Sequence, residues 1–218
     1  MTDVAAPPWP SILLIGPTGA GKTPLGQELE RRGLGGRRCV HFDFGANLRK
    51  LAAGEADRTF LSDEELAAIR HSLATGALFE DRDMPMIVSI LRAFAASRAI
   101  GPGTLLVLNG TPRHVRQAEG LAGTVSVELV VRLEADAAVI RERLRLDPGG
   151  DRSGRTDDSI EAVRERLSDY EKRTRPLIDL YGRRGVRVVA VPVTAAMTAA
   201  ETYNVLEAAL MTEKGGRP

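Results

Sequence analysis

The stretch that decides the fold is Ser11-Ile12-Leu13-Leu14-Ile15, followed by Gly16-Pro17-Thr18-Gly19-Ala20-Gly21-Lys22-Thr23. The first part is a short apolar run, typical of a strand buried on both faces of a parallel sheet. The second part matches the pattern G-x-x-x-x-G-K-[ST], and a helical segment follows to about Arg32. In this setting, loop N–H groups and the helix N-terminus bind phosphate groups. The sequence therefore predicts a nucleotide phosphate site at this loop.

Strands and helices alternate along the rest of the chain. Further candidate strands lie at 39–42, 104–108, 125–133 and 186–191, and candidate helices at 135–146, 157–173 and the C-terminal end. Residues 45–100 read as helices only, with a capping box formed by Ser62 and Glu65. This order predicts an α/β fold with a mainly parallel sheet and a helical insertion at 45–100. We expect one domain over 11–214, preceded by a flexible lead-in at 1–10.

Composition and charge exclude several classes of protein. The 218 residues carry 30 basic and 29 acidic side chains, a net charge of +1, which argues against a general nucleic-acid coat protein. The single cysteine excludes a disulfide framework, and no pair of histidines has metal-ligand spacing. The longest apolar run is too short to span a membrane, and we find no secretory signal. We expect a cytoplasmic protein that is a monomer and binds neither nucleic acid nor membrane.

Three further patches carry polar residues, and the first two directly follow candidate strands. The first is Phe44-Gly45-Ala46-Asn47-Leu48-Arg49, and the second is Asn109-Gly110-Thr111-Pro112-Arg113, with Gln117 four residues after the arginine. The third joins Gly154-Arg155-Thr156-Asp157-Asp158, Arg166 and Thr174-Arg175-Pro176-Leu177-Ile178. Together with the phosphate loop, their order resembles the adenylate kinase family of nucleoside monophosphate kinases, from about residue 11 to 210.

The resemblance implies a fold, an activity and a set of site residues. The fold would be a P-loop three-layer sandwich with a five-stranded parallel sheet, a helical monophosphate-binding insertion at 45–100 and a short lid at 147–157. The activity would be transfer of the γ-phosphoryl group of ATP to a nucleoside monophosphate, AMP by default, with Mg²⁺. The implied residues are Gly16, Gly19, Ala20, Gly21, Lys22 and Thr23 for ATP; Arg49, Arg113 and Gln117 for the monophosphate; Lys22, Arg113, Arg143, Arg155 and Arg166 for catalysis; and Thr23, with Asn109 indirectly, for magnesium.

Elementary chemistry supports these arginines independently of the resemblance. Phosphoryl transfer needs positioning and positive charge rather than covalent catalysis. The acceptor phosphate is already ionised, so no general base is required, and His114 is expected to start a helix at the surface instead. Arginines from distant segments that converge on phosphates would stabilise the developing charge. A bias toward arginine in the source genome also explains their number, 26 against 4 lysines.

The chain departs from the family pattern at three positions. Asn109 stands where the family usually has an aspartate that helps organise Mg²⁺ and its waters. Phe44 replaces a small or hydroxyl residue near the acceptor base, and Ala46 replaces a common aspartate. Asp43, one residue before Phe44, is a candidate to compensate. The identity of the acceptor base stays open.

Three functions therefore remain in competition. The first is a nucleoside monophosphate kinase. The second is a kinase-like protein that binds nucleotide with weak or no turnover, for which Asn109, Phe44 and Ala46 are the motivation. The third is a small-metabolite kinase acting on a hydroxyl group, which would need a carboxylate near the acceptor, and Asp43 is the obvious candidate.

Overall fold

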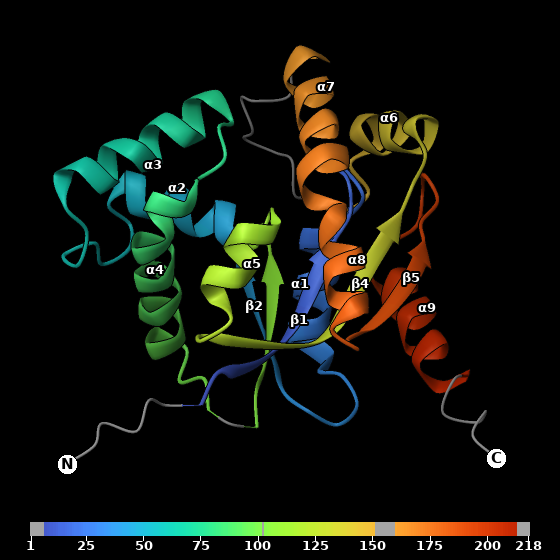
Figure 1. Cartoon of the computed structure of the whole chain (residues 1–218). Coiled ribbons are helices and arrows are strands. Elements are labelled where there is room, and N and C mark those ends of the chain that lie inside the picture. Colours follow the sequence, from blue (N-terminus) through green and yellow to red (C-terminus); the bar gives the residue numbers. More distant parts are fainter. Residues whose placement is uncertain (1–6, 102, 151–159, 213–218) are drawn as a thin grey trace.

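A five-stranded parallel sheet forms the centre of the computed structural model, which describes residues 7–101, 103–150 and 160–212 (Figure 1). The strand order is β2-β3-β1-β4-β5, and every pairing is parallel. The strands are β1 (Trp9–Ile15), β2 (Cys39–Asp43), β3 (Leu105–Asn109), β4 (Val125–Glu134) and β5 (Arg187–Pro192). The predicted fold class is confirmed.

Helices connect the strands and cover the sheet. Their bounds are α1 (Lys22–Arg32), α2 (Phe44–Ala53), α3 (Asp63–Thr75), α4 (Met84–Ser97), α5 (Val115–Leu121), α6 (Ala137–Leu146), α7 (Ile160–Asp169), α8 (Pro176–Arg183) and α9 (Ala199–Thr212). A short 3₁₀ turn, η1 (Asp81–Asp83), precedes α4. The capping box predicted at Ser62 and Glu65 starts α3, with both of its hydrogen bonds formed.

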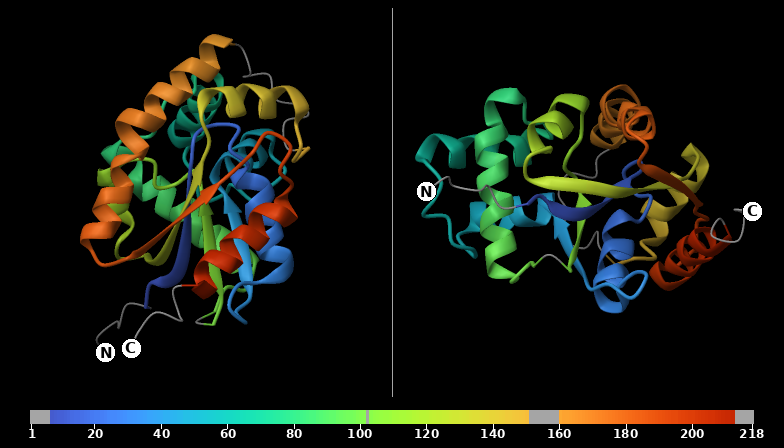
Figure 2. Two further views of the ribbon diagram at one scale, coloured as in Figure 1. Left: turned by 90° about the vertical axis from the view of Figure 1, so that its right-hand side faces the viewer. Right: turned by 60° about the horizontal axis from the view of Figure 1, so that its bottom comes forward.

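Two apolar cores lie on opposite faces of the sheet because successive strand residues point to opposite sides. In β1, Leu13 and Ile15 face a core shared with α2, α4, α5 and α8, whereas Ile12 and Leu14 face a core shared with α1, α6 and α9. Figure 2 shows α1 and α9 on one side of the sheet and α5 and α8 on the other. The chain therefore forms the predicted three-layer sandwich.

The stretch predicted as a helical insertion divides into two structural parts. Helix α4 buries Ile87, Ile90 and Leu91 in the core that contains the sheet residue Phe42, and the ring centroids of Phe94 and Phe42 lie 4.9 Å apart, so α4 belongs to the sandwich itself. Helices α2 and α3 lie beyond the end of the sheet at which the strands terminate (Figure 1). This part of the insertion is placed beside the loops that follow the strands.

Two predicted boundaries are wrong by a few residues. Strand β1 begins at Trp9, inside the expected lead-in, because Trp9 pairs with Val125 of β4. The helix predicted at 157–173 begins outside the described residues; from Ile160 it is α-helical to Asp169, and Tyr170–Thr174 then form a π-helical turn, η2, before α8. In this turn the N–H of Arg175 donates to Tyr170 O at 2.8 Å. Wide turns of this kind are often found at functional sites.

Candidate active site

The phosphate loop connects β1 to α1 in the predicted strand–loop–helix arrangement. Gly19 and Gly21 have φ values of 80° and 93°, a left-handed conformation that favours glycine. A Cβ on Gly21 would also lie 2.8 Å from Arg143 Nη2, so the loop and that arginine are in close contact. The Lys22 ammonium donates to Gly16 O at 2.7 Å and Pro17 O at 2.8 Å. The lysine therefore lies along the loop whose N–H groups are predicted to bind phosphate.

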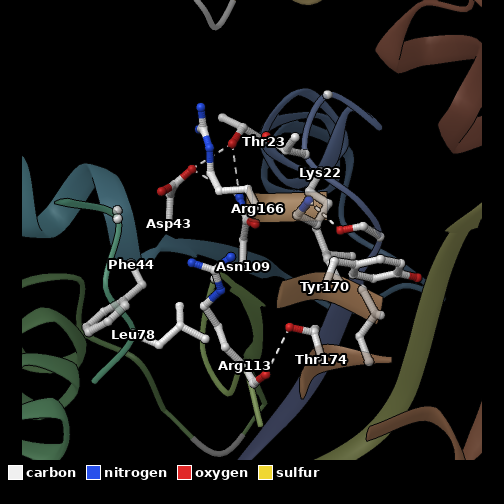
Figure 3. A pocket seen from close by; sticks show the side chains of 18 of the residues that line it. Lys22, Thr23, Asp43, Phe44, Leu78, Asn109, Arg113, Arg166, Tyr170 and Thr174 are labelled. Atoms are coloured by element: carbon white, nitrogen blue, oxygen red, sulfur yellow. Dashed lines mark hydrogen bonds between the residues drawn. The ribbon is translucent and has the colours of Figure 1, made fainter. Parts of the chain in front are cut away.

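Three polar side chains meet beside the loop, at the ends of two strands and the start of α1. Thr23 Oγ1 donates to Asp43 Oδ2 at 2.7 Å. Asn109 Nδ2 lies 3.0 Å from both Thr23 Oγ1 and Asp43 Oδ2. Asp43 and Asn109 are register partners across β2 and β3, which explains why residues so far apart in sequence meet here (Figure 3).

Oxygen donors at this position fit a magnesium ion better than a transition metal. Among the residues that the structure describes, no group of three or more His, Cys, Asp and Glu side chains could hold a metal ion. A Mg²⁺ ion at Thr23 would thus depend on nucleotide phosphates and water for most of its ligands. Magnesium sites on nucleotides commonly have this composition, with one or two carboxylates from the protein.

Four of the five predicted arginines line one cavity together with the phosphate loop. They come from α2, the loop after β3, α6 and α7, and they are Arg49, Arg113, Arg143 and Arg166. In Figure 3, Arg113 extends upward toward Asn109, and the side chain of Arg166 runs upward between Asp43 and Thr23 in this view. The fifth predicted arginine, Arg155, lies outside the described residues, as do Asp157, Asp158 and most of the predicted lid at 147–157.

The backbone of Arg113 is fixed by hydrogen bonds to two side chains. Its N–H donates to Gln117 Oε1 at 2.7 Å, and its carbonyl accepts from Thr174 Oγ1 at 2.9 Å. Burial lowers the pKa of Arg113; nearby Asp169 opposes this shift, whereas Arg166 contributes to it. A buried cation close to a second cation is most stable when an anion occupies the same cavity.

Arg143 has a different environment from the other arginines of the cavity. It is 4% exposed, and its Nε donates to Gly19 O at 3.1 Å. Its Nη1 donates to Thr194 O at 2.6 Å and to Met197 O at 3.1 Å. Arg143 therefore braces the phosphate loop against the segment that follows β5.

The acceptor side of the cavity is formed largely by apolar side chains and by Gln117. Phe44 and Phe79 meet edge to face with ring centroids 5.8 Å apart, and both line the cavity with Leu78. Gln117 is 2% exposed; in addition to accepting from Arg113, it donates from Nε2 to Phe79 O at 2.8 Å. The predicted base-contacting residue thus lines the cavity with both ends of its amide hydrogen-bonded to backbone.

Sequence reasoning missed several contributors to this cavity. Tyr170 and Thr174 of the π-helical turn η2 line it; Thr174 belongs to the third sequence patch but has no role predicted there, and Tyr170 lies outside that patch. The expected surface position of His114 is wrong: it starts α5 as its N-cap, yet it is 7% exposed and its Nε2 lies 3.0 Å from Phe79 O. No local pattern indicates either contact, because each joins segments far apart in the chain.

Comparison with known proteins agrees with this geometry. A family model described as an AAA domain matches residues 15–164. An adenylate kinase of Synechococcus sp. is 36% identical over 81% of this chain and 87% of that protein. Adenylate kinases of Stenotrophomonas maltophilia and Haloarcula marismortui are 31% and 30% identical, over 80% and 79% of this chain and 86% and 85% of those proteins. The chain belongs to the adenylate kinase family.

The residues beside Thr23 differ from the pattern that the family resemblance implies. The family resemblance implies carboxylates at 109 and 46, where the chain has Asn109 and Ala46. Here the carboxylate of Asp43 accepts the hydrogen bond from the Thr23 hydroxyl.

No helix within the described ranges is long and apolar enough to cross a membrane.

Proposed function

We propose that this protein catalyses reversible transfer of the γ-phosphoryl group of ATP to a nucleoside monophosphate, with AMP as the default acceptor. The observation that carries the proposal is a single cavity lined by the phosphate loop and by arginines from distant parts of the chain, among them Arg49, Arg113 and Arg166. Membership of the adenylate kinase family supports the same conclusion.

Each group of residues has a separate part in this proposal. The loop from Gly16 to Thr23, including Gly19, Ala20, Gly21 and Lys22, binds the ATP phosphates. Arg49 and Arg113 bind the acceptor phosphate, and Gln117 contacts its base. Arg166 and Arg155 surround the transferred group. Arg143 acts on the donor side through the loop that it braces.

In this reaction the protein mainly aligns the two phosphates and supplies positive charge. The two phosphates must approach in line, and converging guanidinium groups stabilise the charge that spreads over the equatorial oxygens. When bound with ATP, Mg²⁺ would supply further positive charge to the phosphate groups. Thr23 would contribute a ligand, and Asn109 would act on it through hydrogen bonds. No general base is needed because the acceptor oxygen carries no proton.

The finer parts of the proposal concern assembly and location. The loop and the arginines that line the cavity come from one chain, which supports a monomeric enzyme. Light scattering after gel filtration tests this. We also propose a cytoplasmic location, where ATP and nucleoside monophosphates are available; cell fractionation tests it.

A coupled assay with ATP and Mg²⁺ across AMP, GMP, CMP, UMP and dTMP tests the activity. We expect turnover of at least one monophosphate and loss of about a hundredfold or more in kcat/KM for Arg113→Met. Arg116→Met is the matched control because Arg116 is exposed and pairs with Asp81 on the surface. Absence of transfer to every monophosphate, with ATP binding intact, would leave only a nucleotide-binding protein; transfer to an alcohol alone would select the small-metabolite kinase.

A further inference from the structure

The carboxylate at the end of β2 has no counterpart in the family pattern described above. We propose that Asp43 supplies the negative charge that orders Mg²⁺ beside Thr23, the part that the resemblance assigns to residue 109. The proposal rests on the nucleotide site proposed above and concerns which strand provides the carboxylate.

The register between β2 and β3 explains how a carboxylate on either strand can reach the same place. Asp43 and Asn109 are direct partners in the parallel pairing of β2 and β3, and both are the last residues of their strands. β3 lies next to the phosphate-loop strand β1, and β2 lies one strand further away. Asp43 nevertheless reaches the helix start, with Oδ2 2.7 Å from Thr23 Oγ1. A carboxylate at either strand end can therefore act on the same hydroxyl.

The hydrogen bonds among these groups decide which atom faces a cation. The Thr23 hydroxyl has one proton, which it donates to Asp43 Oδ2. Asn109 Nδ2 donates toward the same hydroxyl oxygen and toward Asp43 Oδ2. The amide nitrogen is a donor and cannot ligate a cation, so Asn109 orients the other two groups. The hydroxyl oxygen keeps a second lone pair for the metal.

The same contacts explain why residue 109 is neutral in this chain. An aspartate at 109 would bring a second carboxylate to about the 3.0 Å that now separates Asn109 Nδ2 from Asp43 Oδ2. Two carboxylates at such a distance repel each other. An amide at 109 converts that repulsion into a hydrogen bond. The pair thus carries one negative charge, placed on β2.

The position of the Asp43 carboxylate is also fixed by a hydrogen bond to α2. Its Oδ1 accepts from the N–H of Ala46 at 2.8 Å and thereby caps α2. Both carboxylate oxygens therefore accept hydrogen bonds from the protein, and these bonds fix the carboxylate beside the Thr23 hydroxyl. A carboxylate fixed at this point places its charge where a cation bound at Thr23 would lie.

The test measures how strongly Mg²⁺ favours ATP binding, independently of turnover. A fluorescent ATP analogue is titrated in Mg²⁺ and in EDTA. The Kd in EDTA divided by the Kd in Mg²⁺, the magnesium ratio, is compared among variants. We expect Asp43→Asn to lower this ratio by about tenfold or more, since one charge is removed from a partly buried site. Asparagine is also a good N-cap, so α2 should be retained. Circular dichroism checks the fold.

Two further variants make the outcome decisive. The charge exchange Asp43→Asn with Asn109→Asp should restore most of the ratio. Asp136→Asn makes the same chemical change at the N-cap of α6, where Asp136 accepts from Val139 N, and should leave the ratio unchanged. An unchanged ratio in Asp43→Asn overturns the proposal, as does a folded exchange variant that stays as low as Asp43→Asn.

The result can be separated from the fate of the proposed function. If monophosphates are phosphorylated but the ratio ignores Asp43, the enzyme assignment stands and the carboxylate assignment fails. If the ratio falls in Asp43→Asn and recovers in the exchange variant, but no monophosphate is phosphorylated, the metal site stands and the proposed acceptor is wrong.

Discussion

Replacing Arg143 with methionine tests whether this arginine works through the phosphate loop. Its guanidinium donates to three carbonyl groups, those of Gly19, Thr194 and Met197, and thereby joins the loop to the segment after β5. Methionine retains much of the apolar stem of the side chain but donates no hydrogen bond. The substitution therefore removes the hydrogen bonds while preserving most of the packing.

The expected loss follows from the number and kind of these bonds. A hydrogen bond from a charged donor contributes about 1.5–3 kcal/mol to the free energy of unfolding. Two of the three bonds share Nη1, so the contributions do not add fully. We expect the free energy of unfolding to fall by about 3–4 kcal/mol, a large share of the total of about 5–15 kcal/mol for a domain.

Urea unfolding of the nucleotide-free protein, followed by circular dichroism, measures this loss. Arg141→Met is the matched control because Arg141 is exposed on the same helix, and we expect a change within about 0.5 kcal/mol. ATP affinity should also fall in Arg143→Met, because Gly19 loses its brace. If Arg143→Met unfolds like the control while ATP affinity falls, the arginine acts by direct contact with the nucleotide and the bracing argument is refuted.

Three further predictions concern single positions. Gly19→Ala would place a Cβ 2.9 Å from a leucine side chain at a residue with a φ of 80°, so we expect ATP affinity to fall by about tenfold or more. Gly36→Ala is the control, because Gly36 has a φ of 77° but open surroundings. It should lower the free energy of unfolding by about 1–2 kcal/mol without changing the affinity for ATP. Burial raises the pKa of Cys39 to about 11, and iodoacetamide at about pH 8 should therefore label the native protein about a hundredfold more slowly than the unfolded chain; equal rates, measured by mass spectrometry, would contradict that burial. Thr174→Val removes the bond to Arg113 O with little change of shape, and steady-state kinetics should show a KM for the monophosphate raised about threefold to tenfold; an unchanged KM would mean that the turn does not position Arg113.

Local patterns were sufficient for the elements whose causes are local. The phosphate loop is one continuous stretch between a buried strand and a helix, and the capping box of Ser62 and Glu65 spans four residues. Boundaries set by distant partners were less accurate. Strand β1 starts at Trp9 because of β4, more than a hundred positions along the chain, and no pattern near Trp9 contains that partner.

The family resemblance predicted which arginines belong to the site. The fold places the four that the structure describes around one cavity. The resemblance did not supply the contacts that fix them: Thr174 on the Arg113 carbonyl and Arg143 on the Gly19 carbonyl both join distant segments. The roles of Arg49, Arg113, Arg143, Arg155, Arg166 and Gln117 remain predictions.

By itself, the sequence determined the phosphate loop, the parallel α/β class and the neutral residue at 109, because each is encoded in consecutive residues. The tertiary structure decided which side chains meet beside the phosphate loop. Asp43, Thr23 and Asn109 meet only because three strands lie side by side and in register, and strand register is a property of the assembled sheet that no single segment specifies.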